Sequence, residues 1–216
     1  MKYLKIFLIA LVIFVNLLVA KPSFADPPKF TKNPDYIEVT QALDELLKVK
    51  NSPELPEGVT QEDIQKSIAD LEFQKYALES GINWGQCRNE TGKTLAVYGA
   101  KPKKSTSTFD NAIYFLADGE TTNDEWDCDG VYLPGGIKVA GLSNNGKTQE
   151  LANPVAVKIL DGTQLVIKAN PDTGAVELNV PPSQIFSAGD ANWFIPNISP
   201  DAIAARIPNA PTIEND

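Results

Sequence analysis

The sequence predicts a mainly β protein with N-terminal helices: an antiparallel β-sandwich or small barrel of about seven strands, preceded by a helical hairpin. Apolar residues recur at helical spacing in the first part of the chain. After Trp84, short runs of alternating apolar and polar residues are separated by Gly, Asn, Asp and Thr, as in a series of strands. The expected organisation is a signal peptide (1–25), a lead-in and helical hairpin (26–81), a disulfide-tied β domain (82–182) and a Pro-rich tail packing on that domain (183–216).

Residues 1–25 contain the three parts of a secretory signal: a short basic start, an apolar stretch over residues 6–20 and a small-residue cleavage motif. Ser23 and Ala25 occupy the two positions that a signal peptidase reads, so cleavage is expected between Ala25 and Asp26. The apolar stretch is shorter than the ~20 residues that span a bilayer, so no stable membrane insertion is expected after cleavage. The mature protein is therefore expected to be exported, to the periplasm or the extracellular space.

Two helices are predicted before the β region. Asn33 and Pro34 provide an N-cap and a first-turn proline for one helix, and Thr60 with Asp63 begins the other. Gly81 ends the second helix, and prolines between the two make the connection short, which favours an antiparallel pair. The apolar residues expected to pack are Ile37, Leu43, Leu46 and Leu47 in the first helix and Ile64, Ile68 and Leu71 in the second.

Seven strands are expected in the β region, joined as an antiparallel meander. They cover residues 95–98, 113–116, 131–133, 137–142, 155–159, 165–167 and 176–180. Asp161-Gly162 and Pro171–Gly174 stand between the last three as hairpin turns. Pro181-Pro182 is expected to end the strands, and a short helix is expected from Ser199-Pro200 onward. The tail is expected to be held on the sheet by Ile195, Ile198, Ile203 and Ile207.

The charge balance excludes some partners. The full chain has 19 Lys and Arg against 28 Asp and Glu, and removal of the signal takes away three of the lysines. A chain this acidic is not expected to bind nucleic acid, because that affinity depends on basic side chains displacing phosphate counterions. Anionic lipid headgroups would repel it for the same reason.

The chain contains no histidine. This excludes catalytic triads with a histidine base and zinc sites built on imidazole, so no catalytic residue is assigned. Cys87 and Cys128 are too few for a zinc site made of thiolates, and in an oxidising compartment they are expected to form one disulfide. The alternative is two separate buried thiols.

Residues 141–148 match the letters of a phosphate-binding P-loop. Such a loop needs a following helix whose positive end faces the phosphates, and Pro154 leaves little room for one. The preferred interpretation is a hairpin turn centred on Asn145-Gly146.

A calcium site is a second candidate, because carboxylate oxygens at alternate positions before a glycine are typical of the start of a calcium loop. Its expected ligands are Asp124, Glu125, Asp127 and Asp129. Counted from Glu125, however, the twelfth position is Gly136, where an EF-hand requires a bidentate glutamate. The alternative is an acidic loop that faces water, and no other cofactor is expected.

Two further features indicate binding surfaces. Lys101, Lys103 and Lys104 form the one concentrated basic stretch of an acidic chain, and could dock an acidic protein or an anionic polysaccharide. Trp126 stands among polar and acidic residues, where it could stack on a sugar. Asn89 and Asn197 lie in glycosylation sequons, although a turn from Asn89 to Gly92 explains the first without a sugar.

Together these observations favour an exported, non-catalytic binding or interaction module whose partner is an unknown protein or polysaccharide. The alternative is a carbohydrate-binding or carbohydrate-cleaving extracytoplasmic protein that uses Trp126 and the acids around it. Assembly through the front helices is disfavoured, because their apolar residues are needed for packing on the β region.

Overall fold

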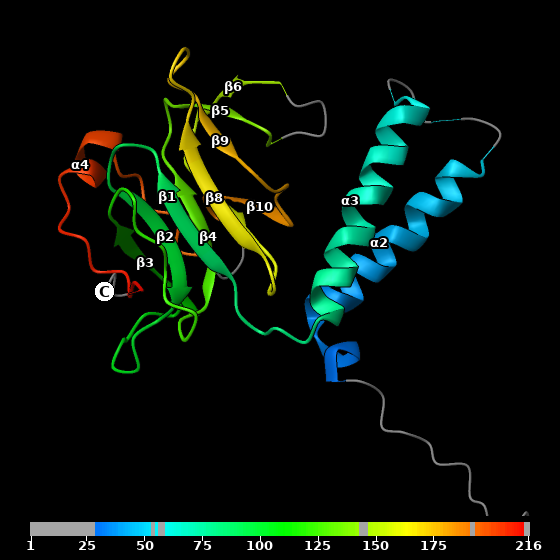
Figure 1. Ribbon diagram of the computed structural model, residues 1–216, viewed down its shortest axis with the longest axis horizontal. Coiled ribbons are helices and arrows are strands. Elements are labelled where there is room, and N and C mark those ends of the chain that lie inside the picture. Colours follow the sequence, from blue (N-terminus) through cyan, green and yellow to red (C-terminus); the bar gives the residue numbers. More distant parts are fainter. Residues whose placement is uncertain (1–28, 53–54, 56–58, 143–146, 191–192, 214–216) are drawn as a thin grey trace, which may run out of the picture.

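The computed structural model describes residues 29–52, 55, 59–142, 147–190 and 193–213. The expected signal peptide and its cleavage residues, Ala25 and Asp26, lie outside these ranges. Two five-stranded sheets pack face to face as a sandwich, and a helical hairpin stands beside them (Figure 1). No helix among the described residues is long and apolar enough to cross a bilayer.

The hairpin begins after a short 3-10 turn, η1 (Lys29–Lys32), and consists of α2 (Pro34–Lys50) and α3 (Gln61–Glu79). Both predicted helix starts are confirmed. The Asn33 side chain accepts a hydrogen bond from the Asp35 N–H, and Thr60 with Asp63 forms a capping box. After α3, Gly81 adopts the positive φ of 77° that ends many helices.

The first sheet has the strand order β1-β8-β9-β5-β6 and the second the order β10-β7-β4-β2-β3. The strands of the first sheet are β1 (Gln86–Glu90), β5 (Lys138–Ala140), β6 (Gln149–Glu150), β8 (Gln164–Ala169) and β9 (Val176–Leu178). Those of the second are β2 (Leu95–Ala100), β3 (Asn111–Leu116), β4 (Cys128–Leu133), β7 (Val155–Lys158) and β10 (Gln184–Ser187).

All seven expected strands are present, in a sandwich and not a closed barrel, but the expected antiparallel meander is wrong in two respects. In the first sheet β1 pairs with β8, and β5 with β9, in parallel. The turn at Asp161-Gly162 does not join two strands of a hairpin, because β7 lies in the second sheet and β8 in the first. The alternation of side chains determines which face is buried but not which strand is the neighbour, so these pairings escaped prediction.

Three strands were not expected. β1 contains Arg88, Asn89 and Glu90 and lacks an apolar alternation, and β6 has only two residues. β10 follows Pro181-Pro182, so the expectation that these prolines end the strands is wrong. β10 lies at the edge of its sheet and pairs with β7 alone.

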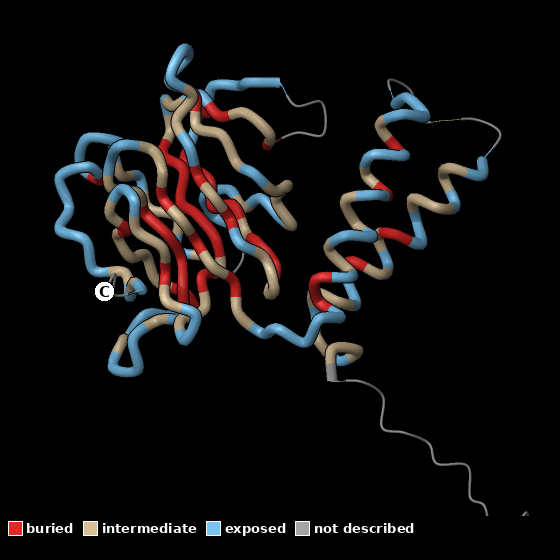
Figure 2. Tube along the Cα trace, in the orientation of Figure 1, coloured by how far each residue is buried: buried red, intermediate tan, exposed pale blue. Residues whose placement is uncertain are grey.

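The main core lies between the two sheets, where buried residues of both form one cluster (Figure 2). The other face of the second sheet is covered by the C-terminal segment. Tyr98 and Tyr132 pack there with Ile203, and their hydroxyls donate to the carbonyls of Phe194 and Pro196 at 2.9 and 2.6 Å. Both tyrosine hydroxyls are thus hydrogen-bonded, so burying the two rings between the tail and the sheet leaves no unpaired hydroxyl.

The short helix predicted in the tail is confirmed as α4 (Pro200–Ala204), with Ser199 as its N-cap. Ile195, Ile198 and Ile203 pack on the second sheet as expected. Ile207 is 87% exposed, so its expected role in holding the tail is wrong.

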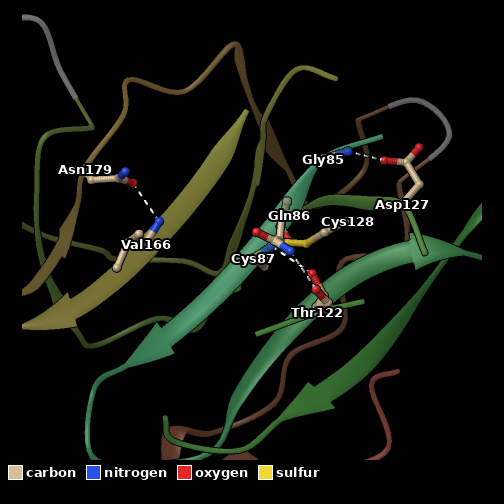
Figure 3. The surroundings of a disulfide bond; sticks show 9 residues. Gly85, Gln86, Cys87, Thr122, Asp127, Cys128, Val166 and Asn179 are labelled. Atoms are coloured by element: carbon tan, nitrogen blue, oxygen red, sulfur yellow. Dashed lines mark hydrogen bonds between the residues drawn. A yellow bond between two sulfur atoms is a disulfide. The ribbon is translucent and has the colours of Figure 1, made fainter. Parts of the chain in front are cut away.

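A disulfide joins Cys87 of β1 to Cys128 of β4 and thus links the two sheets (Figure 3). Both cysteines are fully buried, with a Cα–Cα distance of 5.9 Å. Hydrogen bonds surround the bond: the Cys87 N–H donates to Thr122 Oγ1 at 2.9 Å, and the Gly85 N–H donates to Asp127 Oδ1 at 2.7 Å. The predicted disulfide is therefore present, and both of its cysteines belong to the main core.

Replacing both cysteines, as Cys87→Ala/Cys128→Ala, is expected to lower the free energy of unfolding by about 4 kcal/mol, because the bond closes a long loop in the unfolded chain. Urea denaturation of the oxidised wild type and of the double variant measures the difference. A loss below about 1 kcal/mol would contradict the structural role given to the bond.

Candidate functional site

A cavity of about 310 Å³ opens at the end of the sandwich beneath α4, and is called the end cavity below. Its walls are the turn before β2, the last residues of β4, the β8–β9 turn and one side of α4. Apolar side chains dominate its lining: Leu95, Leu133, Ile137, Val176 and Ile203. Leu95, Ile137 and Val176 also pack on the main core, so the cavity continues that core to the surface.

The end cavity and the disulfide lie at opposite ends of the strands. Cys128 is the first residue of β4, whereas Leu133 is its last and lines the cavity. Five residue steps of a strand span about 17 Å. The two sheets are thus joined covalently at one end. At the other end the cavity extends from the main core around the end of the second sheet to α4.

Few polar side chains face the end cavity. Thr91, Lys93 and Thr94, all from the turn before β2, line one side of it. Tyr132 also lines the cavity, but its hydroxyl donates to the Pro196 carbonyl and accepts from the Ile198 N–H. This arrangement suits a ligand that is mostly apolar and has at most one polar end.

A wider hollow of about 640 Å³ adjoins the end cavity at Pro200. Asn153, Asn197 and Ser199 contribute polar side chains to it. Its lining is slightly more polar than apolar, whereas the lining of the end cavity is mostly apolar, so the end cavity is the better site for an apolar ligand.

The sequence-predicted binding residues lie away from the end cavity. Trp126 packs edge-to-face on Tyr114, with ring centroids 5.1 Å apart, and rests against Gly99. A Cβ at Gly99 would overlap the indole, and the register of β2 against β4 shifts at this glycine. The half-buried Trp126 therefore packs on the edge of the main core, near the disulfide.

The basic stretch lies in the β2–β3 loop, at the far end of β2 from the cavity. Lys101 is engaged within the loop, where Nζ lies 3.6 Å from Asp110 Oδ1 and donates to the Ser107 carbonyl at 3.3 Å. Lys103 and Lys104 are exposed. These two lysines are therefore accessible to a partner.

The four proposed calcium ligands are dispersed. Asp124 and Glu125 are exposed, whereas Asp127 accepts the Gly85 N–H and Asp129 is half-buried in β4. Within the described residues, no three side chains of His, Cys, Asp or Glu gather closely enough to hold a metal ion. The calcium hypothesis therefore gains no support from the geometry.

Two of these residues, Asp127 and Asp129, form with Asp161 a group of partly buried carboxylates that influence one another. Burial, together with the charge of Asp127, raises the pKa of Asp129 to about 7. The same two causes, with Asp35 as a third, raise the pKa of Asp161 to about 6. The pKa of Asp127 is also raised by burial, although the Gly85 N–H opposes the shift. Sequence analysis named Asp127 and Asp129 as candidate calcium ligands but did not connect them with Asp161, which is close to them only in the fold.

Two other motifs find structural explanations. β5 and β6 pair antiparallel around residues 141–148, with no helix after Thr148, as the hairpin interpretation of the P-loop letters requires. The turn residues 143–146 themselves lie outside the described ranges.

Asn89 is fully buried and its Nδ2 donates to the carbonyls of Lys93 and Leu116, so this amide stabilises the β1–β2 turn. Asn197 is exposed.

No family model, no curated protein and no solved structure matches this chain. Its function therefore has to follow from the chemistry of its own residues.

The Trp126→Ala variant is expected to lose about 3 kcal/mol of unfolding free energy, because the indole fills the space above Gly99. The adjacent exposed residue provides a control: Glu125→Ala should change stability by less than about 0.5 kcal/mol. Urea denaturation measures both. If Trp126→Ala were as stable as Glu125→Ala, the indole would have no structural role and a ligand-stacking role would gain weight.

Proposed function

We propose that the mature protein is an exported, non-catalytic binding module that holds a small apolar ligand in the end cavity. The observation that carries this proposal is the cavity itself, about 310 Å³ of space with predominantly apolar walls at the open end of the sandwich. Small-molecule sites typically start at about this size and combine apolar walls with a few polar groups. At about 30 Å³ per group, the cavity accommodates about ten non-hydrogen atoms.

Export is supported by two independent features. The first 25 residues follow the order of a secretory signal. The Cys87–Cys128 disulfide is the kind of bond that persists in an oxidising compartment. A binding module in that setting meets ligands outside the cytoplasm, and the acidic charge of the chain favours its solubility there.

The carbohydrate alternative has less support. A sugar-stacking platform needs an open aromatic face, whereas Trp126 packs on Tyr114 and Gly99. A sugar would also require many polar partners, and the lining of the end cavity offers only a few.

Calorimetric titration of residues 26–216 with octanoate and 1-octanol tests the proposal, since each has about ten non-hydrogen atoms. At about 0.5 kcal/mol per atom, the expected Kd is about 0.2 mM. Glucose, of similar size but polar, should not bind. Binding of neither apolar probe, or binding of glucose in preference to them, would contradict the proposal.

A cavity-filling variant locates the binding. Ala169 lines the cavity and shares the inward side of β8 with Leu165 and Ile167, so Ala169→Phe should place its ring in the ligand's space. Affinity for the apolar probes should fall at least about tenfold. Ala188→Phe, an exposed position that lines none of the described cavities, is the matched control. Equal affinity in both variants would place the probes elsewhere.

A further inference from the structure

The polar side chains of the end cavity are unevenly distributed. Apart from Tyr132, they all belong to the turn before β2, where Thr91, Lys93 and Thr94 line one side. Lys93 is exposed, whereas several of the apolar lining residues pack on the buried core, so Lys93 lies at the mouth of the cavity. The cavity therefore has an apolar interior and a single polar edge.

Lys93 is the one charged side chain in the lining of the end cavity. Within the described part of the chain, no carboxylate forms an ion pair with it. Two acids near this turn have other partners: Glu90 binds Arg88 and Lys168, and Asp118 accepts a backbone N–H of the turn at 2.7 Å. The charge of Lys93 is thus available to a ligand.

The hydrogen-bonding groups at the mouth favour an acceptor. The Thr91 hydroxyl is directed at Asn89 Oδ1, 2.8 Å away, and at the Lys93 carbonyl, 3.1 Å away. The Tyr132 hydroxyl is bonded to the tail. The ammonium group of Lys93 and the hydroxyl of Thr94 have no partner among the described residues, and both can donate. A carboxylate, which only accepts, matches these two donors.

We infer that the ligand of the end cavity is a medium-chain monocarboxylate whose carboxylate binds Lys93 at the mouth while its alkyl chain lies along the apolar walls, an assignment that rests on the proposed function. Thr94 adds a second hydrogen bond to the carboxylate. The space for about ten non-hydrogen atoms corresponds to a fatty acid of about eight to ten carbons.

The charge of the whole chain makes the contact with Lys93 important for selectivity. The chain has 28 Asp and Glu against 19 Lys and Arg, so its overall field repels anions. A carboxylate needs a local cation to offset that field, and an alkylammonium ion is repelled by the same cation at the mouth. Because Lys93 is exposed, its ion pair with the ligand should change affinity by a factor of about two to five.

The test is calorimetric titration of residues 26–216 with octanoate, 1-octanol and octylammonium at an ionic strength of about 0.1 M. Lys93→Met removes the charge but keeps an unbranched side chain. It should weaken octanoate about two- to fivefold, strengthen octylammonium and leave 1-octanol within about 1.5-fold. Lys93→Glu should weaken octanoate at least about fivefold and strengthen octylammonium further, because a repulsion replaces the attraction.

Lys48→Met is the matched control. Lys48 is an exposed residue of α2, which lies on the opposite side of the sandwich from α4 (Figure 1), and it lines none of the described cavities. This variant removes the same charge and should leave octanoate affinity within about 1.5-fold, because the site is far beyond the Debye length of about 10 Å.

The affinity for 1-octanol separates the failure of this assignment from the failure of the proposed function. Unchanged 1-octanol binding in Lys93→Met shows that the variant is folded with its cavity intact. If octanoate then bound equally well, or if Lys48→Met weakened octanoate as much as Lys93→Met, the carboxylate assignment would be overturned and the apolar site would stand. If neither octanoate nor 1-octanol bound the wild type, both would be overturned.

Discussion

The covalent bond between Cys87 and Cys128 is the constraint on which the arrangement of the two sheets depends. It joins the first strand of one sheet to the central strand of the other, inside the main core. Hydrogen bonds reinforce the surroundings of the disulfide: Cys87 and Thr122 bond to each other through two hydrogen bonds, and Asp127 accepts from the Gly85 N–H. At this end of the sandwich the sheets therefore have little freedom to separate or slide.

The rest of the molecule is arranged around that fixed end. The end cavity opens where the strands are farthest from the disulfide, and α4 covers it there as part of a tail that Tyr98 and Tyr132 hold in place. The helical hairpin occupies a third position, where Val39 and Leu78 pack on Leu160 and Asp35 forms an ion pair with Lys158. The proposed ligand site and the contact with the hairpin thus lie on separate parts of the sandwich.

Local structure was predictable from the sequence where a residue type has a single common structural role, such as capping a helix or filling one face of a strand. Asn33 and Thr60 mark the helix starts, Ser199 marks α4, and the alternating valines and isoleucines mark the central strands. The disulfide was predictable because the chain offers no other partner for either cysteine. β1 escaped prediction because its stability comes from pairing with β8 and from the residues near Thr122, not from its own apolar pattern.

The candidate site was beyond sequence analysis for a related reason. Leu95, Ile137 and Ile203 are ordinary apolar residues in sequence, and only the fold brings them to one cavity. Asp129 was predicted as a calcium ligand and Asp161 as a turn residue, and only the fold reveals the burial that raises the pKa values of both. For Trp126 the sequence suggested a binding role, because its neighbours in the chain are polar and acidic. In the fold its indole packs against Gly99, which the sequence does not show.

The central claim is that the sandwich is closed by a disulfide at one end and holds an apolar cavity at the other. A crystal structure of residues 26–216 under xenon pressure tests it most directly, because xenon enters apolar cavities without needing polar partners. The account predicts xenon density between Leu95, Ile137 and Ile203, with the sulfurs of Cys87 and Cys128 bonded. Side chains filling that space with no xenon present, or two free thiols, would contradict it.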